Sequence, residues 1–290
     1  MKFGIDKHIE AISGTSVGAL NAALFVNGDL KLAEDIWINY IDDKIIDLKT
    51  DIKLIKKELI EKGIYEALEK YFNLLKTIGI FSRNGLYEII ERYINVTSIS
   101  RSKIPIYATC TKFPSLKAEY FKLNGKSNEE IIKIIFASSA IPVIFPFEKI
   151  DDNIYIDGGF SDDSPVEKLY DENCNHIIVV HLKAIEIIKD RKENVTIYEI
   201  CPQDNLGGFF KGVLDFSREG AISRIKQGYE EAKKIIEPAL IMLEENYIKR
   251  HNIKMMIERN KKWFYKRKDC VNKRKKLKQD IIDSMNSKDK

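Results

Sequence analysis

Along this chain the hydrophobic residues have the spacing of a strand in some segments and that of a helix in others. The first change from a predicted strand to a predicted helix lies near Gly14. Residues 8–13 predict a short strand that ends at this glycine. Residues 18–27 are small or apolar and predict a buried helix that ends near Gly28. The start of the sequence therefore predicts a strand, a sharp turn and a helix in direct succession.

The rest of the pattern alternates between helices and strands. From residue 30 to residue 95 the apolar positions have helical spacing, and we expect these helices to cover or cap a sheet. The pattern then predicts strands at residues 104–111, 119–123, 153–156 and 177–182, and helices at residues 128–139 and 218–243. Strands that alternate with helices over about 240 residues favour one α/β domain.

Composition excludes several classes of protein. Of the 290 residues, 44% are hydrophobic and 32% are charged, which is not typical of a disordered, collagen-like or membrane-embedded chain. No apolar run reaches about 18 residues, and Asp6 and Glu10 precede the apolar segment 11–26, unlike the cationic start of a signal peptide. Four widely spaced cysteines without a CxxC pair indicate free thiols in a reducing compartment. We therefore expect a cytoplasmic protein.

The formal net charge of +4 conceals an asymmetric distribution. Residues 245–290 hold 16 basic and 6 acidic residues, a net charge of +10, which leaves −6 for residues 1–244. Aromatic residues lie among the basic ones: Tyr247, Trp263, Phe264 and Tyr265. A basic, aromatic helix suits peripheral adsorption to an anionic membrane surface, loose contact with nucleic acid, or a solvated extension without a partner. We expect no specific nucleic acid.

The turn near residue 14 contains a motif that suits catalysis. Gly14-Thr15-Ser16-Val17-Gly18 matches the GxSxG pattern, in which glycines let the chain pack closely around a strained turn while the serine hydroxyl projects freely. The helix that follows would direct its first amides, that of Val17 included, toward an oxyanion formed there. The alternative is a glycine-rich turn with a structural or nucleotide-binding role.

A serine hydroxyl needs a base to become a nucleophile, and two candidates follow it in the sequence. Asp157 ends a predicted strand and precedes Gly158 and Gly159, which permit a tight turn, although such a turn can also be purely structural. His181 ends another apolar strand and would complete a Ser16–Asp157–His181 triad, unless it is a packed core residue. If Asp157 acts alone at neutral pH, burial must raise its pKa above the ordinary value of ~3.9.

Three blocks of sequence together resemble the patatin-like phospholipase family. They are residues 14–23, residues 137–142 (Ala-Ser-Ser-Ala-Ile-Pro), and residues 156–159 with Ser164-Pro165-Val166 after them. The blocks occur in the family's order and cover about residues 8–240. The resemblance implies a three-layer α/β fold, with a central, mostly parallel sheet flanked by helices. It places the catalytic domain at residues 1–240 and leaves residues 241–290 as a basic helical tail.

The resemblance also implies a lipid acyl hydrolase that acts on lipid or ester substrates through an acyl-enzyme. Carried over by position, Ser16 is the nucleophile and Asp157 the proton acceptor of a dyad that needs no histidine, metal or cofactor. Ser138 and Ser139 lie in the second block, where we expect them to have packing roles.

Two features depart from the family pattern. Family members carry a glycine-rich stretch well before the nucleophile, whose amides form most of the oxyanion hole, but only 13 residues precede Gly14 and they contain no glycine run. Val17 would then be a partial oxyanion hole, so we expect either an N-terminally truncated domain of a longer chain or a catalytically weak remnant that binds lipid or protein. Asp163 stands where the family more often has asparagine, and a like charge close to Asp157 would raise its pKa.

Overall fold

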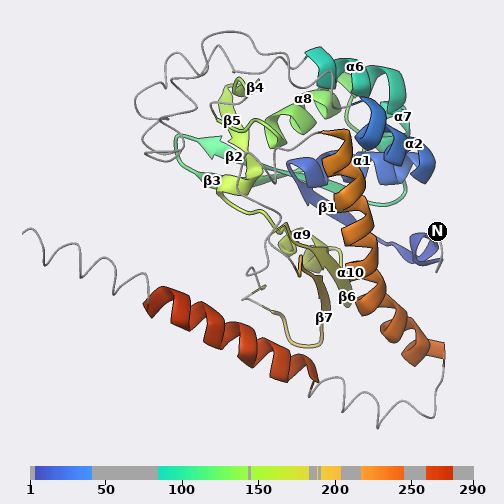
Figure 1. Ribbon diagram of the computed structural model, residues 1–290. Coiled ribbons are helices and arrows are strands. Elements are labelled where there is room, and N and C mark those ends of the chain that lie inside the picture. The colour runs from blue at the N-terminus through green and yellow to red at the C-terminus, as the bar shows by residue number, and fades with distance from the viewer. Residues whose placement is uncertain are drawn as a thin grey trace, which may run out of the picture.

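The computed structural model describes most of the predicted α/β region and part of the tail. The described residues are 4–40, 84–142, 145–182, 188, 191–203, 217–244 and 259–276. The part of the predicted helical region at residues 41–83 lies outside them. Within the described residues, helices surround a central sheet, so the α/β fold with flanking helices is confirmed (Figure 1).

A five-stranded sheet has β2 at its centre (Figure 1). Its strands are β1 (Ile12–Thr15), β2 (Ile106–Phe113), β3 (Lys117–Lys122), β4 (Glu148–Ile150) and β5 (Asn153–Asp157). β1 pairs parallel with β2, whereas β3 and β5 pair antiparallel with β2, and β4 pairs antiparallel with β5. The predicted strand at residues 8–13 is displaced, because a short 3₁₀ helix, η1 (Ile5–His8), comes first.

Two strands meet end to end along one edge of β2. Thr109 pairs with Thr15 at the carboxyl end of β1, and the next residue, Cys110, pairs with Asp157 at the carboxyl end of β5. β3 occupies the opposite edge, since Thr109 also pairs with Tyr120. Neighbouring residues of a strand lie about 3.3 Å apart along its axis. The register of β2 therefore brings the ends of two strands that are far apart in the sequence next to each other.

β6 (His176–Val180) and β7 (Thr196–Ile200) form a separate, two-stranded parallel sheet. Ile177 and Val179 are buried, but Val180 is 68% exposed, so this apolar strand is not buried on both faces. Two of the five strand pairs within the described residues are parallel and three are antiparallel, so the described strands pair in a mixed pattern within the predicted α/β architecture. Apolar periodicity predicts where a strand lies but not the direction of its partner.

The described helices pack around these strands, and those predicted at residues 18–27, 128–139 and 218–243 have bounds close to the predicted ones. They are α1 (Val17–Asn27), α2 (Leu30–Asp35), the π-helical η2 (Ile36–Tyr40), α6 (Asn84–Tyr93), α7 (Val96–Ser100), α8 (Asn128–Ser138), the 3₁₀ helix η3 (Gly158–Phe160), α9 (Glu167–Asp171) and α10 (Arg218–Glu244). Small residues of α1, such as Ala19 and Ala23, are fully buried, as are Ile131 and Ile135 of α8 and Ala108 of β2. α1 and α8 therefore share one core with the sheet.

Local sequence signals explain where α8 begins and where α1 ends. The Ser127 hydroxyl accepts a hydrogen bond from the Glu130 N–H at 3.2 Å, and the Glu130 carboxylate accepts one from the Ser127 N–H at 2.9 Å. This reciprocal capping box satisfies two amides that the helix itself leaves without partners. α1 ends at Gly28, whose φ of 76° is the left-handed conformation that favours glycine after a helix.

α10 runs along one side of the molecule and contacts both η2 and β7 (Figure 1). It continues past residue 240, so the expected boundary between residues 1–240 and 241–290 falls inside a helix, and that division stays a prediction. Residues 259–276 form a further helix. None of the helices that the structure describes is both long enough and apolar enough to span a bilayer.

Candidate active site

Ser16 occupies the turn between β1 and α1. Its φ of 55° lies in the left-handed region, which residues other than glycine rarely adopt. A Cβ atom added to Gly14 would lie 2.3 Å from the backbone oxygen of Gly18, so the turn requires a glycine at position 14. A Cβ atom at Gly18 would meet nothing within 4 Å, so close packing explains only the first glycine of the motif. The strained turn predicted from the sequence is present.

The hydroxyl of Ser16 points at Asp157. It donates a hydrogen bond to Asp157 Oδ2 at 2.6 Å, although the residue stands at the N-cap of α1, where serine hydroxyls commonly bind helix amides. The other carboxylate oxygen, Oδ1, accepts a hydrogen bond from the Gly159 N–H at 2.8 Å. The Asp157 N–H donates to the Ala140 oxygen at 2.9 Å. The carboxylate is therefore held by its own turn and by the residues that follow α8.

Burial raises the pKa of Asp157 from its ordinary 3.8 to about 6, because only 5% of this residue is exposed and a charged carboxylate is poorly solvated there. The hydrogen bonds from Ser16 and Gly159 lower the pKa and so oppose this effect. The negative charge of Asp163 raises it further, as expected from the sequence. Asp157 is consequently a stronger base than an exposed aspartate, while most of it remains ionised at pH 7.

The turn after Asp157 packs directly on β2 and β1. A Cβ atom on Gly158 would lie 2.3 Å from the Thr109 oxygen and 2.8 Å from Cγ2 of Thr15, so only glycine fits at this position. The Thr111 hydroxyl donates to the backbone oxygen of Asp157 at 2.8 Å. Close packing therefore requires glycine at position 158, which the Asp-Gly-Gly pattern alone did not show.

Ser138, the last residue of α8, touches the backbone of Ser16. The Ser16 N–H donates to Ser138 Oγ at 2.9 Å, and the Ser138 hydroxyl donates to the Thr109 oxygen at 2.7 Å. Ser138 is fully buried. The hydroxyl of Ser139 instead donates to the Ile135 oxygen of its own helix at 2.9 Å. Ser138 is therefore packed inside the protein and in addition bonds to the backbone of Ser16, a contact that depends on how α8 docks on the sheet.

The loop between η3 and α9 is fastened to β1. The Ser13 hydroxyl donates to the Pro165 oxygen at 2.6 Å, and the Thr15 hydroxyl donates to the Asp162 oxygen at 2.9 Å. The Tyr120 hydroxyl of β3 donates to Asp162 Oδ2 at 2.7 Å. These bonds restrict the segment that follows Asp157 directly.

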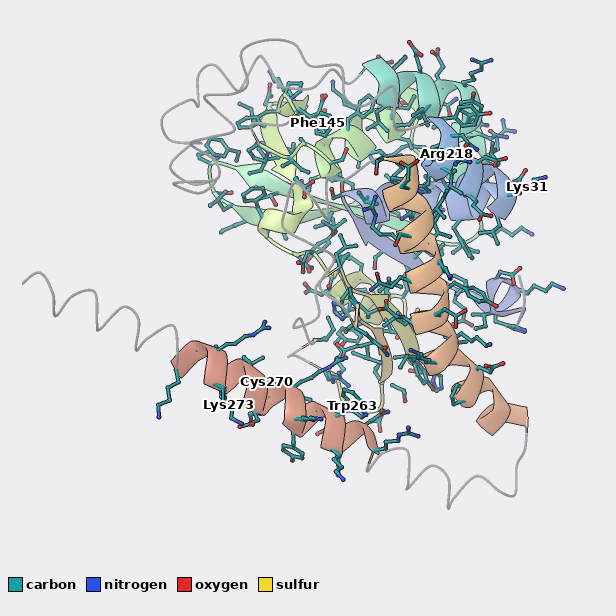
Figure 2. The ribbon with its side chains drawn as sticks, viewed as in Figure 1. Lys31, Phe145, Arg218, Trp263, Cys270 and Lys273 are labelled. Atoms are coloured by element: carbon teal, nitrogen blue, oxygen red, sulfur yellow. The ribbon has the colours of Figure 1, made fainter. Side chains whose placement is uncertain are left out.

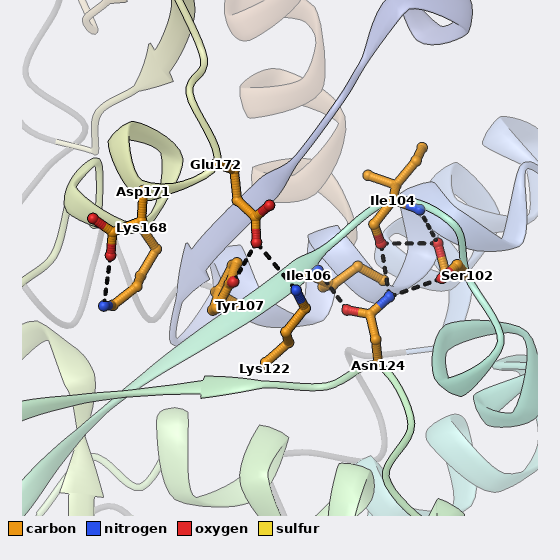
Figure 3. A network of polar contacts seen from close by, with 9 residues as sticks. All are labelled: Ser102, Ile104, Ile106, Tyr107, Lys122, Asn124, Lys168, Asp171 and Glu172. Atoms are coloured by element: carbon orange, nitrogen blue, oxygen red, sulfur yellow. Dashed lines mark hydrogen bonds and ion pairs between the residues drawn. The ribbon is translucent and has the colours of Figure 1, made fainter.

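α9 is held against the sheet from its other end (Figure 3). Glu172 follows this helix and accepts a hydrogen bond from the Tyr107 hydroxyl of β2. The same carboxylate pairs with the Lys122 ammonium of β3 at 3.1 Å. The loop that carries Asp162 therefore has fixed ends on both sides.

His181 has partners of its own. Its Nδ1 lies 3.2 Å from Ser164 Oγ, and its Nε2 lies 3.4 Å from Glu199 Oε1. The side chain is fully buried. Both oxygens of the Asp157 carboxylate are meanwhile engaged by other groups, Oδ2 by the Ser16 hydroxyl and Oδ1 by a backbone N–H. The structure therefore brings Ser16 and Asp157 together but does not assemble the Ser16–Asp157–His181 triad.

The amides at the start of α1 are candidate donors to an oxyanion. The Ser16 N–H is already engaged by Ser138. In the described part of the chain, the N–H groups of Val17 and Gly18 have no acceptor. They lie at the N-terminus of an 11-residue helix, where the helix dipole adds partial positive charge. Val17 is therefore the donor nearest to the Ser16 hydroxyl along the chain.

Among the described residues, no group of three or more histidine, cysteine, aspartate or glutamate side chains is placed to hold a metal ion. Cys110, Cys174 and Cys201 are buried free thiols, and Cys270 is an exposed one. Burial raises the pKa of the Cys110 thiol well above its ordinary value, which disfavours the reactive thiolate.

Comparison with known proteins yields one family. The family model for patatin-like phospholipase matches residues 2–170, which is more than half of the 290 residues. This match includes β1, α1, β5 and α8, and therefore every residue of the Ser16–Asp157 site described above. No curated protein gives a significant match to the chain.

Proposed function

The chain belongs to the patatin-like phospholipase family, a family of lipid acyl hydrolases, and from this premise we propose that Ser16 and Asp157 are its catalytic dyad. The observation that carries the proposal is the 2.6 Å hydrogen bond from the Ser16 hydroxyl to the buried Asp157 carboxylate. A base in direct contact with a serine hydroxyl, with a pKa close to the working pH, can remove the proton as the oxygen attacks. A lipid or carboxylic ester is the substrate class.

The proposed reaction has two halves. Ser16 Oγ attacks the ester carbonyl carbon while its proton passes to Asp157, and the tetrahedral intermediate then expels the alcohol, which takes that proton. The acyl group remains on Ser16 as an ester. A water molecule next gives its proton to Asp157 and attacks the acyl carbon, and collapse releases the fatty acid as the proton returns to Ser16 Oγ.

Backbone amides would stabilise the negative charge that develops on the carbonyl oxygen. The Val17 N–H, at the start of α1, is the donor that we assign to this role, with the dipole of the helix behind it. Removal of one such donor typically costs about 10²–10³ in rate, so the strength of this hole sets how active the chain is. No metal or cofactor takes part in the proposed steps.

The experiment is an ester-hydrolysis assay with p-nitrophenyl butyrate. We expect the full chain to turn over the ester and release p-nitrophenol, and the Ser16→Ala variant to release none above the uncatalysed rate. Ser139→Ala is the matched control, because its hydroxyl bonds only within α8. Equal background rates in all three proteins would contradict the dyad and favour the catalytically inactive remnant that the sequence left open.

The helix at residues 259–276 supports a second, independent part of the proposal, namely peripheral contact with an anionic lipid surface. Ten of its 18 residues are basic and one is acidic, and 16 of them are exposed. Tyr265 is 62% exposed, and Figure 2 shows Lys273 projecting from the helix. Positive charge beside an exposed aromatic ring matches the chemistry of anionic headgroups.

One face of this helix is directed at the rest of the protein. The positive charge of Arg267 acts on Cys201, the residue after β7, and lowers the Cys201 pKa against the effect of burial. Tyr265 lies about 200° around the helix from Arg267, so it faces away from the body. The outward face is therefore the one that would meet lipid.

Vesicle co-sedimentation tests this contact. We expect the chain to bind phosphatidylglycerol vesicles at low salt, and Lys261→Glu/Lys268→Glu to weaken binding by at least about 30-fold, since each lysine near an anionic surface contributes about 1 kcal/mol. Lys31→Glu/Lys133→Glu makes the same charge change at exposed sites elsewhere and should have little effect. Equal binding by both variants, or binding to single-stranded DNA alone, would contradict the proposal.

A further inference from the structure

The hydrogen bond between α8 and the turn at Ser16 joins two segments that are 122 residues apart in sequence. Ser138 Oγ accepts from the Ser16 N–H at 2.9 Å and donates to the Thr109 oxygen at 2.7 Å. Its single hydroxyl proton is thus directed toward β2, which leaves an oxygen lone pair for Ser16. The geometry fixes which group is donor and which is acceptor in both bonds.

The Ser16 N–H has no regular partner of its own. The ladder between β1 and β2 ends at Thr15, and Ser16 precedes the first residue of α1, so neither the sheet nor the helix supplies an acceptor. A buried N–H without an acceptor destabilises the folded state. A left-handed φ at a residue other than glycine adds backbone strain. The conformation of Ser16 therefore depends on contacts outside its own turn, and Ser138 supplies one of them.

We propose that Ser138 is a positioning residue for the nucleophile. Its hydroxyl holds the backbone of Ser16 in the conformation that aims Oγ at Asp157. It also engages the Ser16 N–H, which leaves oxyanion binding to Val17 at the start of α1. This inference rests on the proposed function, because positioning has a measurable effect only if Ser16 is the nucleophile.

The neighbouring residue is a natural control. Ser139 has the same side chain, but its hydroxyl bonds to the Ile135 and Phe136 oxygens within α8, at 2.9 and 3.4 Å. Loss of the Ser139 hydroxyl removes contacts inside one helix, whereas loss of the Ser138 hydroxyl removes the link to Ser16. Both substitutions remove a serine hydroxyl, but the hydrogen-bond partners that each hydroxyl loses lie in different parts of the fold.

The experiment compares wild type, Ser138→Ala, Ser138→Cys and Ser139→Ala in ester hydrolysis, with rates expressed per folded molecule. We expect Ser138→Ala to lower kcat by about 10- to 100-fold, since a small misplacement of a reacting group can cost about 10²-fold. KM should change by less than about twofold, because the substrate-binding surface is untouched. Ser138→Cys keeps the shape with a weaker hydrogen-bonding group, so its kcat should fall between those of wild type and Ser138→Ala.

Two further readouts separate positioning from a general loss of structure. The pH midpoint of kcat should stay near the wild-type value in Ser138→Ala, because the burial of Asp157 is unchanged, while the rate of phosphonylation of Ser16 by a fluorophosphonate falls in parallel with kcat. Ser139→Ala should match wild type in every measurement. A folded Ser138→Ala or Ser138→Cys protein with wild-type kcat, or a loss expressed in KM alone, would overturn this inference. Absence of hydrolysis in wild type would instead reject the proposed function itself.

Discussion

Ser16 and Ser164 each have a hydroxyl that faces a potential base, and their surroundings differ in nearly every other respect. Ser16 donates to Asp157 at 2.6 Å from a left-handed turn at the start of an 11-residue helix. Ser164 lies 3.2 Å from His181 Nδ1, in a loop that precedes the five-residue helix α9. Serine with histidine is the more familiar pair in hydrolases, yet the backbone around Ser164 offers none of the features present at Ser16.

The two bases are also held differently. Among the described residues, the Asp157 carboxylate accepts from Ser16 and Gly159, and burial raises its pKa to about 6. The ring of His181 stands between Ser164 and Glu199, and the Glu199 carboxylate is itself paired with an arginine at 2.6 Å. His181 therefore braces the loop after Asp157 against β7. Backbone geometry and donor amides, more than the type of base, favour Ser16 over Ser164 as the proposed nucleophile.

Removal of each serine should give the largest contrast. We expect Ser16→Ala to lower kcat/KM for a p-nitrophenyl ester by at least about 10³-fold, since it removes the atom that forms the acyl-enzyme. Ser164→Ala should remain within about twofold of wild type. Steady-state assays of the two folded variants check this, and a larger loss in Ser164→Ala than in Ser16→Ala would reverse the assignment.

Replacement of each base should come next in size. Asp157→Asn leaves the shape of the side chain but removes the proton acceptor, and general-base catalysis contributes about 10²–10⁴-fold, so we expect a loss of kcat near 10³-fold. His181→Gln should change kcat by less than about threefold, because no hydrogen bond links this ring to Ser16 or Asp157. A higher residual activity in Asp157→Asn than in His181→Gln would contradict the assignment of Asp157 as the base.

The pH dependence of kcat/KM should follow the carboxylate and not the imidazole. Only ionised Asp157 can accept the proton, and burial raises its pKa to about 6, so activity should be half-maximal near that pH and fall about tenfold for each unit below it. His181→Gln should leave this midpoint unchanged. The measurement is the pH dependence of kcat/KM for wild type and His181→Gln. Loss of the midpoint near pH 6 in His181→Gln would assign the titration to the imidazole.

Stability should show the smallest effect, with opposite signs at the two sites. The folded-state pKa of Asp157 lies above its ordinary 3.8, so its protonated form stabilises the fold below that pH, and this contribution is lost as pH rises through about 6. Asp157→Asn should therefore raise the free energy of unfolding at pH 7 by about 2–3 kcal/mol, with little gain below pH 4. His181→Gln should lower it by about 1–3 kcal/mol. Urea denaturation at both pH values measures these changes.

The local features of the site were predicted well from the sequence, because each of them depends on a few consecutive residues. The strand, turn and helix around Ser16 are present, and so is the turn of Asp157 with two glycines. The pairing of β5 with β2 was not predictable from periodicity, since strand direction and register depend on contacts between distant segments. That register is what places Asp157 beside the end of β1.

Contacts between segments that are far apart in the sequence were not predicted, for the same reason. Ser138 lies in a block that resembled the family's, but only the docking of α8 on β2 brings its hydroxyl to the Ser16 N–H. The partners of His181 come from the loop after Asp157 and from β7, a strand that periodicity did not predict. Sequence patterns identify candidate residues, whereas the hydrogen-bond partners of those residues depend on the fold.

Labelling with a fluorophosphonate identifies which serine of the chain is activated as a nucleophile. The serine oxygen attacks phosphorus, fluoride leaves, and the hydroxyl proton goes to the base, so a stable adduct marks the activated serine. Peptide mass spectrometry should locate one adduct on Ser16 in the wild-type chain and in His181→Gln, and none at that position in Asp157→Asn. An adduct on Ser164, or equal labelling of Ser16 with and without the Asp157 carboxylate, would contradict the dyad.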